Sequence, residues 1–145
     1  MNKSNHAPAC NGLHIASETD GQKEYLIPHD GAYYAGHHVL LDIWNGKHLD
    51  NIQMIDSALR SGANEAGATL LHLHLHQFNA NGGVSGVAVL AESHISIHTW
   101  PEWNYAAVDV FMCGETNPMK TAEVIKNAFK PDCINITEHY RGRVR

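Results

Sequence analysis

Apolar and polar residues alternate along residues 69–78, and this pattern restricts the segment to one kind of secondary structure. Leucines occupy every second position and histidines lie between them: Leu71, Leu73 and Leu75 against His72, His74 and His76. Successive side chains point to opposite faces in a β-strand, so the segment is predicted to be a strand with one apolar and one histidine face. Residues 93–99 alternate in the same way: Ile95 and Ile97 against His94, Ser96 and His98. Both segments are therefore predicted to lie in a sheet that buries one face.

The remaining periodic segments complete the predicted fold. Further strands are predicted at 36–44, 84–91, 105–113 and 134–139. One helix is predicted to be capped by Asp50 or Asn51 and to run to about residue 66, and a second to be capped by Asn117 with Pro118 at its first position. The order β-α-β-β-β-β-α-β predicts an α+β fold, a two-layer sandwich with two helices on one face of a mostly antiparallel sheet. An open sheet face in a domain of this size is typical of a protein that dimerises.

Residues 1–34 are polar and, apart from a short strand candidate at 24–27, show no periodicity. We expect a loosely ordered N-terminal extension there, followed by one domain at residues 35–145. The net charge is -5 and no basic stripe is present, so nucleic acid is not an expected partner. The only basic cluster is interpreted as a solvated tail end: Arg141, Arg143 and Arg145.

Cysteine usage and hydropathy indicate the compartment. The three cysteines are widely spaced, which argues against a disulfide framework and against a cysteine zinc site: Cys10, Cys113 and Cys133. No apolar run approaches the length of about 18 residues that a membrane span requires, and no signal peptide is visible. A cytoplasmic protein without a membrane association is the expectation.

The segment around Ser93 suggests self-cleavage. A serine hydroxyl can attack the carbonyl of the preceding residue, here Glu92, and convert the amide to an ester. A base then removes the serine α-proton, the ester breaks by elimination, and the resulting dehydroalanine hydrolyses to a pyruvoyl group. Ser85, in a glycine-flanked bend, is suited to assist the first step, and His98 is suited to act as the base. Cys113, on a neighbouring strand, is suited to reprotonate a substrate carbanion.

Residues 92–102, ESHISIHTWPE, closely resemble the signature of the prokaryotic S-adenosylmethionine decarboxylase proenzyme family. The resemblance extends over about residues 35–144 and includes 105–111 and 83–86. It implies cleavage between Glu92 and Ser93, with Ser93 becoming the pyruvoyl group that forms a Schiff base with the substrate. It also implies that Ser85 and His98 serve processing and that Cys113 donates the proton in decarboxylation.

The resemblance further implies products and partners. Cleavage would give a β chain of residues 1–92 and an α chain of 93–145. Family members are dimers of αβ heterodimers with active sites at the dimer interface, and they feed spermidine synthesis from S-adenosylmethionine. Phe78, Trp100 and Glu102 are expected to contact the substrate.

Three alternatives stay open on the residues alone. The first is a pyruvoyl-dependent decarboxylase of the same fold family that acts on arginine or ornithine. The second is a non-catalytic metal-binding module that uses His72 and His76 on one strand face, although the spacing is explained by alternation alone and we expect no metal. The third is an uncleaved regulatory homologue, against which the joint presence of the candidate residues argues: Ser85, Ser93, His98 and Cys113.

Overall fold

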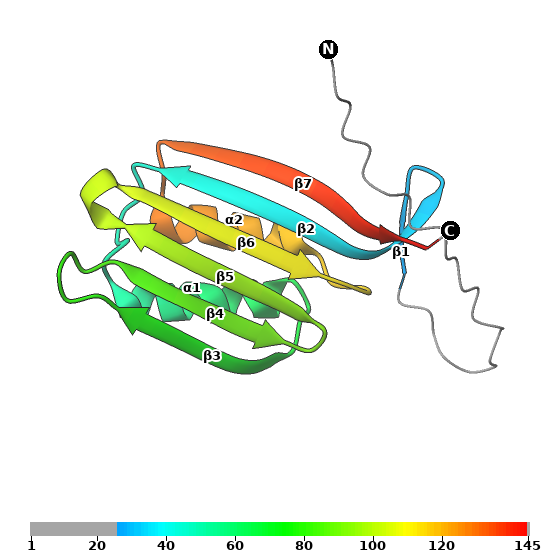
Figure 1. Cartoon of the computed structure of the whole chain (residues 1–145), viewed down its shortest axis with the longest axis horizontal. Coiled ribbons are helices and arrows are strands. Elements are labelled where there is room, and N and C mark those ends of the chain that lie inside the picture. The colour runs from blue at the N-terminus through cyan, green and yellow to red at the C-terminus, as the bar shows by residue number, and fades with distance from the viewer. Residues whose placement is uncertain (1–25, 145) are drawn as a thin grey trace, which may run out of the picture.

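The computed structural model describes residues 26–144, which form one seven-stranded sheet with two helices on a single face (Figure 1). The strands follow the order β1-β2-β6-β5-β4-β3, and β7 pairs with β2. All strand pairs are antiparallel. The strands are β1 (Ile27–His29), β2 (Ala32–Trp44), β3 (Leu70–Gln77), β4 (Val84–Leu90), β5 (Ser93–Trp100), β6 (Tyr105–Met112) and β7 (Cys133–Arg143). The predicted α+β sandwich is confirmed.

Asparagine caps define where the two helices begin. The side chain of Asn51 accepts a hydrogen bond of 3.1 Å from the amide of Met54 at the start of α1 (Ile52–Glu65). Asn117 accepts one of 3.0 Å from Met119 at the start of α2 (Pro118–Phe129). Each cap satisfies one of the amides that the first helical turn leaves without a partner. Of the two caps predicted for α1, Asn51 rather than Asp50 is used.

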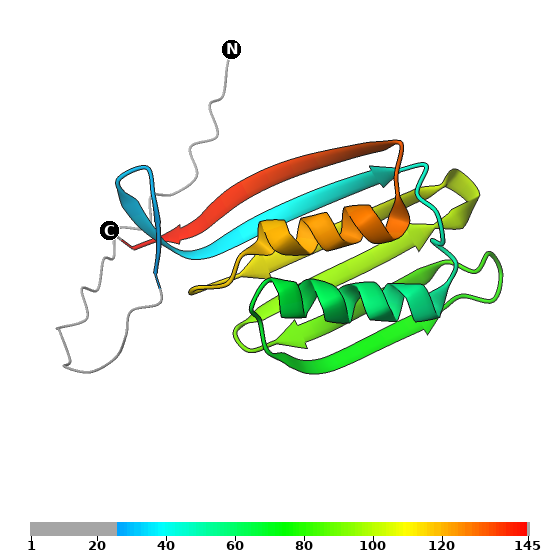
Figure 2. The same ribbon diagram turned by 180° about the vertical axis from the view of Figure 1, so that it is seen from behind.

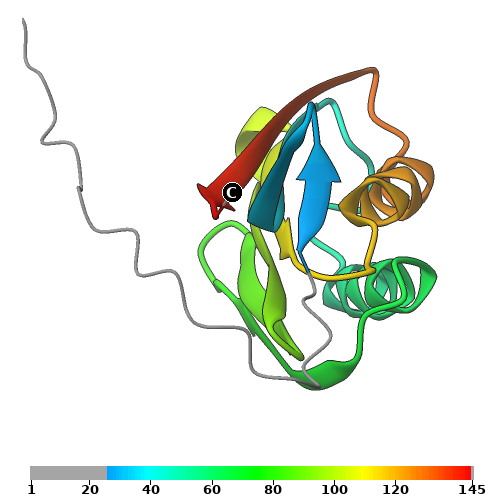
Figure 3. The same ribbon diagram turned by 90° about the vertical axis from the view of Figure 1, so that its right-hand side faces the viewer.

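The core lies between the helices and the sheet (Figure 2). Its largest fully buried side chains come from both layers: Ile55, Leu59, Ile125 and Phe129 from the helices, and Leu41, Ile43, Ile95 and Ile97 from the strands. The predicted inward face of residues 93–99 is thereby confirmed. Viewed along the sheet, both helices lie on the same side, and within residues 26–144 no helix covers the opposite face (Figure 3).

Residue 71 contradicts the predicted alternation. Leu71 was expected beside Leu73 and Leu75, yet it is 64% exposed. A β-bulge between Leu70 and His72 adds a residue to β3, so Leu70 takes the inward position and packs against the core. The histidines of β3 lie on the bare face as predicted, because they follow the bulge: His72, His74 and His76.

Residues 27–34 of the expected N-terminal extension belong to the sheet. β1 and the first residues of β2 form a hairpin within residues 27–34. Its His29 ring stacks on Tyr140 of β7, with centroids 3.7 Å apart and planes 10° apart. Residues 1–25, with Cys10 and the first half of the strand candidate at 24–27, lie outside the described residues, as does Arg145. Within residues 26–144, neither helix is long and apolar enough to cross a membrane.

The contact between the helices gives a stability prediction. A Cβ atom on Gly62 of α1 would lie 2.9 Å from Cγ2 of Thr121 on α2. Gly62→Ala should therefore destabilise the protein by roughly 1 kcal/mol, because overpacking against a stiff β-branched side chain outweighs the better helix propensity of alanine. Denaturant unfolding at one protein concentration measures the change.

Thr121→Ser provides the matched background for this substitution. It removes Cγ2 but keeps the hydroxyl that donates to the Gly62 carbonyl at 2.8 Å. In that background Gly62→Ala should become stabilising, by up to about 1 kcal/mol. A destabilisation of equal size in both backgrounds would exclude the Thr121 methyl as its cause.

Candidate active site

Ser93 begins β5, directly after the two-residue turn that joins it to β4. Ser93 pairs with Leu90 across this turn, and its side chain is buried at 7% exposure. Glu92, the residue before it, has φ 60. This left-handed conformation costs a non-glycine residue about 1–2 kcal/mol. The peptide expected to break therefore follows a strained residue.

Cys113 makes close contacts with both sides of that peptide. Its Sγ lies 3.7 Å from Ser93 Oγ, and its amide donates to the same oxygen at 3.3 Å. The thiol also donates to the carbonyl oxygen of Glu92 at 3.2 Å. A hydroxyl nucleophile, the carbonyl that it would attack and a donor for the developing oxyanion are thus in one contact set. Cys113 and Ser93 thus lie side by side.

The sheet register explains how Cys113 reaches Ser93. His94 pairs with Phe111, so the chain after β6 meets the turn before β5. Gly114 then reverses the chain at φ 66, and the hydroxyl of Thr116 donates to the Cys113 carbonyl at 2.7 Å. These contacts hold the cysteine at the end of the strand.

A hollow of about 360 Å³ opens beside the Glu92–Ser93 peptide. Its lining comes from β4, the β4–β5 turn, β5, β6 and β7: Leu90, Glu92, Ser93, His94, Phe111 and Arg141. Sequence reasoning missed Arg141, which it assigned to a solvated tail. Arg141 instead pairs with Gly36 inside β7, and its Cζ lies 5.6 Å from the centroid of the Phe111 ring. Sequence periodicity carries no signal for this contact between distant strands.

Ser85 and His98 form a second cluster, away from Ser93. Ser85 lies in β4 rather than in a bend, and its Oγ shares a hydrogen bond of 2.9 Å with Nδ1 of His98. Five residues separate His98 from Ser93 along β5, which is roughly 16 Å in an extended strand. The burial pattern also places Ser93 on the helix side and His98 on the bare face. The structure therefore does not bring all four candidate residues together within one chain.

The expected substrate-contacting residues lie at the His98 end. Trp100 stacks with Trp103 at 6.4 Å, and Glu102 accepts hydrogen bonds of 3.1 Å from Asn81 on the loop after β3. Phe78, on the same loop, is 47% exposed. An aromatic surface with one carboxylate thus surrounds the Ser85–His98 pair.

Tyr105 contacts side chains on two neighbouring strands at the same end of the sheet. Its ring stacks on Trp100 at 5.4 Å, and its hydroxyl donates to Asp42 at 2.6 Å. Burial, together with this hydrogen bond, raises the pKa of Tyr105 to about 12. The phenol therefore stays protonated and keeps its bond to Asp42 throughout the physiological pH range.

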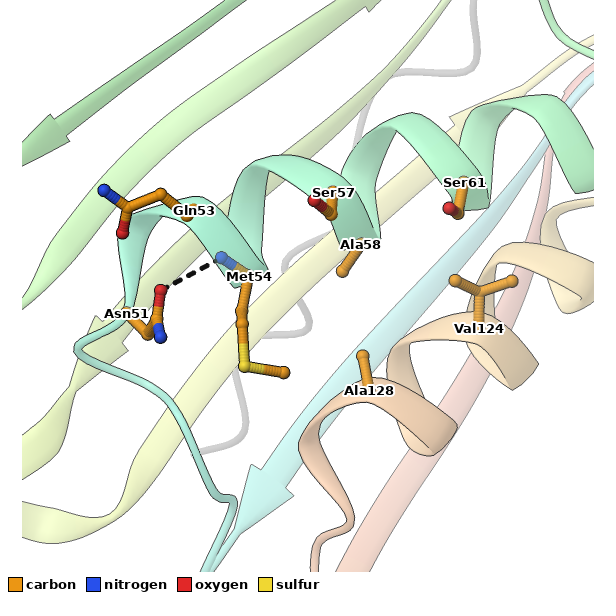
Figure 4. Close-up of a pocket in the computed structure, with 8 residues that line it drawn as sticks. All are labelled: Asn51, Gln53, Met54, Ser57, Ala58, Ser61, Val124 and Ala128. Atoms are coloured by element: carbon orange, nitrogen blue, oxygen red, sulfur yellow. Dashed lines mark hydrogen bonds between the residues drawn. The ribbon is translucent and has the colours of Figure 1, made fainter.

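A hollow between the helices, the lack of a metal cluster and two free thiols complete the description of residues 26–144. A hollow of about 430 Å³ lies between α1 and α2, and its lining has no charged residue (Figure 4): Asn51, Gln53, Met54, Ser57, Ala58, Ser61, Val124 and Ala128. Among the described residues, no three His, Cys, Asp or Glu side chains are placed to hold a metal ion. Cys113 and Cys133 are both free thiols.

Comparison with known proteins identifies the family. Residues 37–142 match the family model described as S-adenosylmethionine decarboxylase. The chain belongs to this family. The matched range contains every candidate residue of both clusters.

Named relatives and a solved structure agree with the family assignment. The chain is 42% identical over 110 residues to the S-adenosylmethionine decarboxylase proenzyme of Thermomicrobium roseum, a match covering 75% of this chain and 95% of the relative. It is 48% identical over 96 residues to the proenzyme of the same name from Thermotoga maritima, covering 66% of this chain and 73% of the relative. The crystal structure of the adenosylmethionine decarboxylase from Aquifex aeolicus is similar with a TM-score of 0.70 and 34% identity, covering 77% of this chain and 94% of that one.

The backbone at residue 92 provides a test of strain. In a Ser93→Ala background, which lacks the attacking hydroxyl, Glu92→Gly should be more stable than Glu92→Ala by about 1 kcal/mol, because only glycine adopts positive φ without a steric cost. The two variants differ by a single Cβ atom, so loss of the glutamate side chain is common to both. Equal unfolding free energies would show that residue 92 carries no strain.

Proposed function

We propose that this protein is a self-cleaving, pyruvoyl-dependent decarboxylase. It converts S-adenosylmethionine to S-adenosylmethioninamine for spermidine synthesis. The observation that carries the proposal is the contact set in which Ser93 Oγ and the Cys113 thiol meet the strained Glu92–Ser93 peptide. This contact set occurs in a chain whose named relatives are S-adenosylmethionine decarboxylase proenzymes.

Self-cleavage follows from these contacts in two stages. Ser93 Oγ attacks the Glu92 carbonyl carbon, the peptide C–N bond breaks, and an ester with a free amino group forms. Cys113, 3.2 Å from the carbonyl oxygen, donates to it as negative charge develops. A base then takes the Ser93 α-proton, the Cβ–Oγ bond breaks, and Glu92 leaves as a carboxylate. Hydrolysis of the dehydroalanine releases ammonia and leaves the pyruvoyl group on residue 93.

The residues around position 93 fit that group. A pyruvoyl group supplies a ketone that reacts with the substrate amine and accepts electrons when carbon dioxide leaves. Cys113 remains beside residue 93 after cleavage and holds the proton that the substrate α-carbon needs. The hollow lined by His94 and Phe111 leaves room for a small amino acid moiety at this position.

The base for the elimination comes from a second copy of the chain in this proposal. His98 lies at the opposite end of the sheet from Ser93 and cannot reach it in its own chain. A two-fold pairing of the bare sheet faces would place the Ser93 end of one copy against the His98 end of the other. Each active site of the resulting dimer of αβ heterodimers then contains Ser93 and Cys113 of one copy with the partner's Ser85 and His98.

The aromatic surface at the His98 end favours S-adenosylmethionine over arginine or ornithine. The exposed rings of Phe78 and Trp103, with Trp100, offer flat faces for an adenine ring and for the sulfonium cation. Glu102 offers a carboxylate that can accept hydrogen bonds from ribose hydroxyls. Arginine and ornithine have no ring to stack on this surface.

Ser93→Ala should abolish cleavage, because alanine has no nucleophile. A denaturing gel should show one full-length band for the variant and two bands for the wild type, residues 1–92 and 93–145. Cys113→Ala serves as the comparison: it keeps the nucleophile and should still cleave, although more slowly because the donor to the Glu92 carbonyl is lost, and it should release little carbon dioxide from S-adenosylmethionine. Two fragments from Ser93→Ala would show that Ser93 is not the nucleophile. Release of carbon dioxide from arginine or ornithine, and not from S-adenosylmethionine, by the wild type would show that the proposed substrate is wrong.

Complementation between two inactive variants tests the shared active site. Ser93→Ala and His98→Ala should each stay uncleaved when expressed alone. When equal amounts are co-expressed with tags of different length, about half of the His98→Ala chains should cleave, because random mixing pairs half of them with a partner that supplies His98. No cleavage in the mixture would place the base within the same chain.

A further inference from the structure

The elimination step creates a negative charge on the α-carboxylate of Glu92, and none of the candidate residues described above supplies a cation to pair with it. Before the step, Glu92 is joined to Ser93 Oγ as a neutral ester; after it, Glu92 ends in an α-carboxylate next to its own side-chain carboxylate. Two like charges in one partly enclosed hollow raise the free energy of the leaving state unless a cation is present. The following inference rests on the self-cleavage proposed above.

Arg141 is the permanently charged cation in that hollow. It lines the hollow together with Glu92 and Ser93, and its guanidinium reaches across β2 to lie over the Phe111 ring of β6. Within residues 26–144 it forms no ion pair with a carboxylate. The carboxylates of Glu138 on β7 and Asp109 on β6 are already engaged: Glu138 lies 2.9 Å from His37, and Asp109 accepts a hydrogen bond of 3.3 Å from Ser96.

The local backbone is adapted to hold Arg141 in this place. A Cβ atom on Gly36, the residue paired with Arg141, would overlap Cζ of Phe111, so only glycine leaves room for the ring. Gly142, directly after Arg141, has φ 68, a conformation that glycine adopts without cost. The ring therefore lies beneath the guanidinium, which keeps the hydrogen-bonding edge of the cation free for an anion.

We propose that Arg141 receives the carboxylate leaving group of Glu92 during self-cleavage and then binds the new C-terminus of the β chain. As the base removes the Ser93 α-proton, the electron pair of the breaking Cβ–Oγ bond moves onto the carboxylate. The guanidinium pairs with both of its oxygens, a bidentate geometry that suits arginine better than lysine. Formation of the ester needs no such cation, because no carboxylate exists at that stage.

Arg141→Gln tests this assignment by separating the two stages of cleavage. The variant should cleave at least about 10-fold more slowly than the wild type and should accumulate the ester, because a charge-assisted hydrogen bond is lost only from the second stage. The ester has the mass of the uncleaved chain, but hydroxylamine splits it into residues 1–92 as a hydroxamate and 93–145 with an unmodified serine. Arg141→Lys keeps the charge without the bidentate geometry and should restore part of the rate, which keeps the test valid if the glutamine variant folds poorly.

Arg143→Gln, two residues along β7, is the matched control and should cleave at the wild-type rate. A wild-type rate for Arg141→Gln without a hydroxylamine-sensitive fraction would overturn the inference. Slow cleavage without accumulated ester would overturn it too, because the defect would then precede elimination. Failure of the wild type to cleave would instead refute the proposed function itself.

Discussion

The register of β5 against β6 decides which groups of this chain can react with one another. Because His94 pairs with Phe111, the residue after β6 meets the turn before β5, and Cys113 touches both Ser93 and Glu92. A slip of one residue would turn every side chain of β5 to the other face and expose its buried isoleucines. The same strand pairs therefore determine both the core packing and the geometry of the candidate site. The helices pack against the buried face of these strands and so stabilise the register, although they hold none of the candidate residues.

The alternation of residue types predicted most of the strands and the inward face of β5, because a half-buried strand leaves a direct imprint on the sequence. Three features left no such imprint. The bulge at Leu71 changes which residue faces the core although the alternation of residue types continues. The β1 hairpin packs on the sheet through the stacking of His29 on Tyr140. Arg141 is positioned by its contact with the Phe111 ring, two strands away. Each arises from contacts between distant segments, which local periodicity does not record.

Closeness in sequence also misled the interpretation of the site. Ser93 and His98 are five residues apart, which suggested that they form one cluster. In an extended strand, however, a spacing of five residues separates the two side chains both in direction and in distance. It places them on opposite faces, and it moves them roughly 16 Å along the sheet. The chemistry of the individual residues could be inferred from their types, whereas their grouping required the strand geometry.

The separation of the two clusters has a consequence for when the proposed enzyme becomes active. The strained peptide and its nucleophile are present in every folded copy, whereas in the proposed dimer the base for the elimination would come only from the partner across the paired faces. A single copy can therefore reach the ester and return to the amide, since both steps are acyl transfers between the same two atoms of Ser93. Elimination is the irreversible step, and it depends on a group that arrives with the second copy. Assembly would then precede the commitment to cleavage, and the pyruvoyl group would form only where a complete pocket already surrounds it.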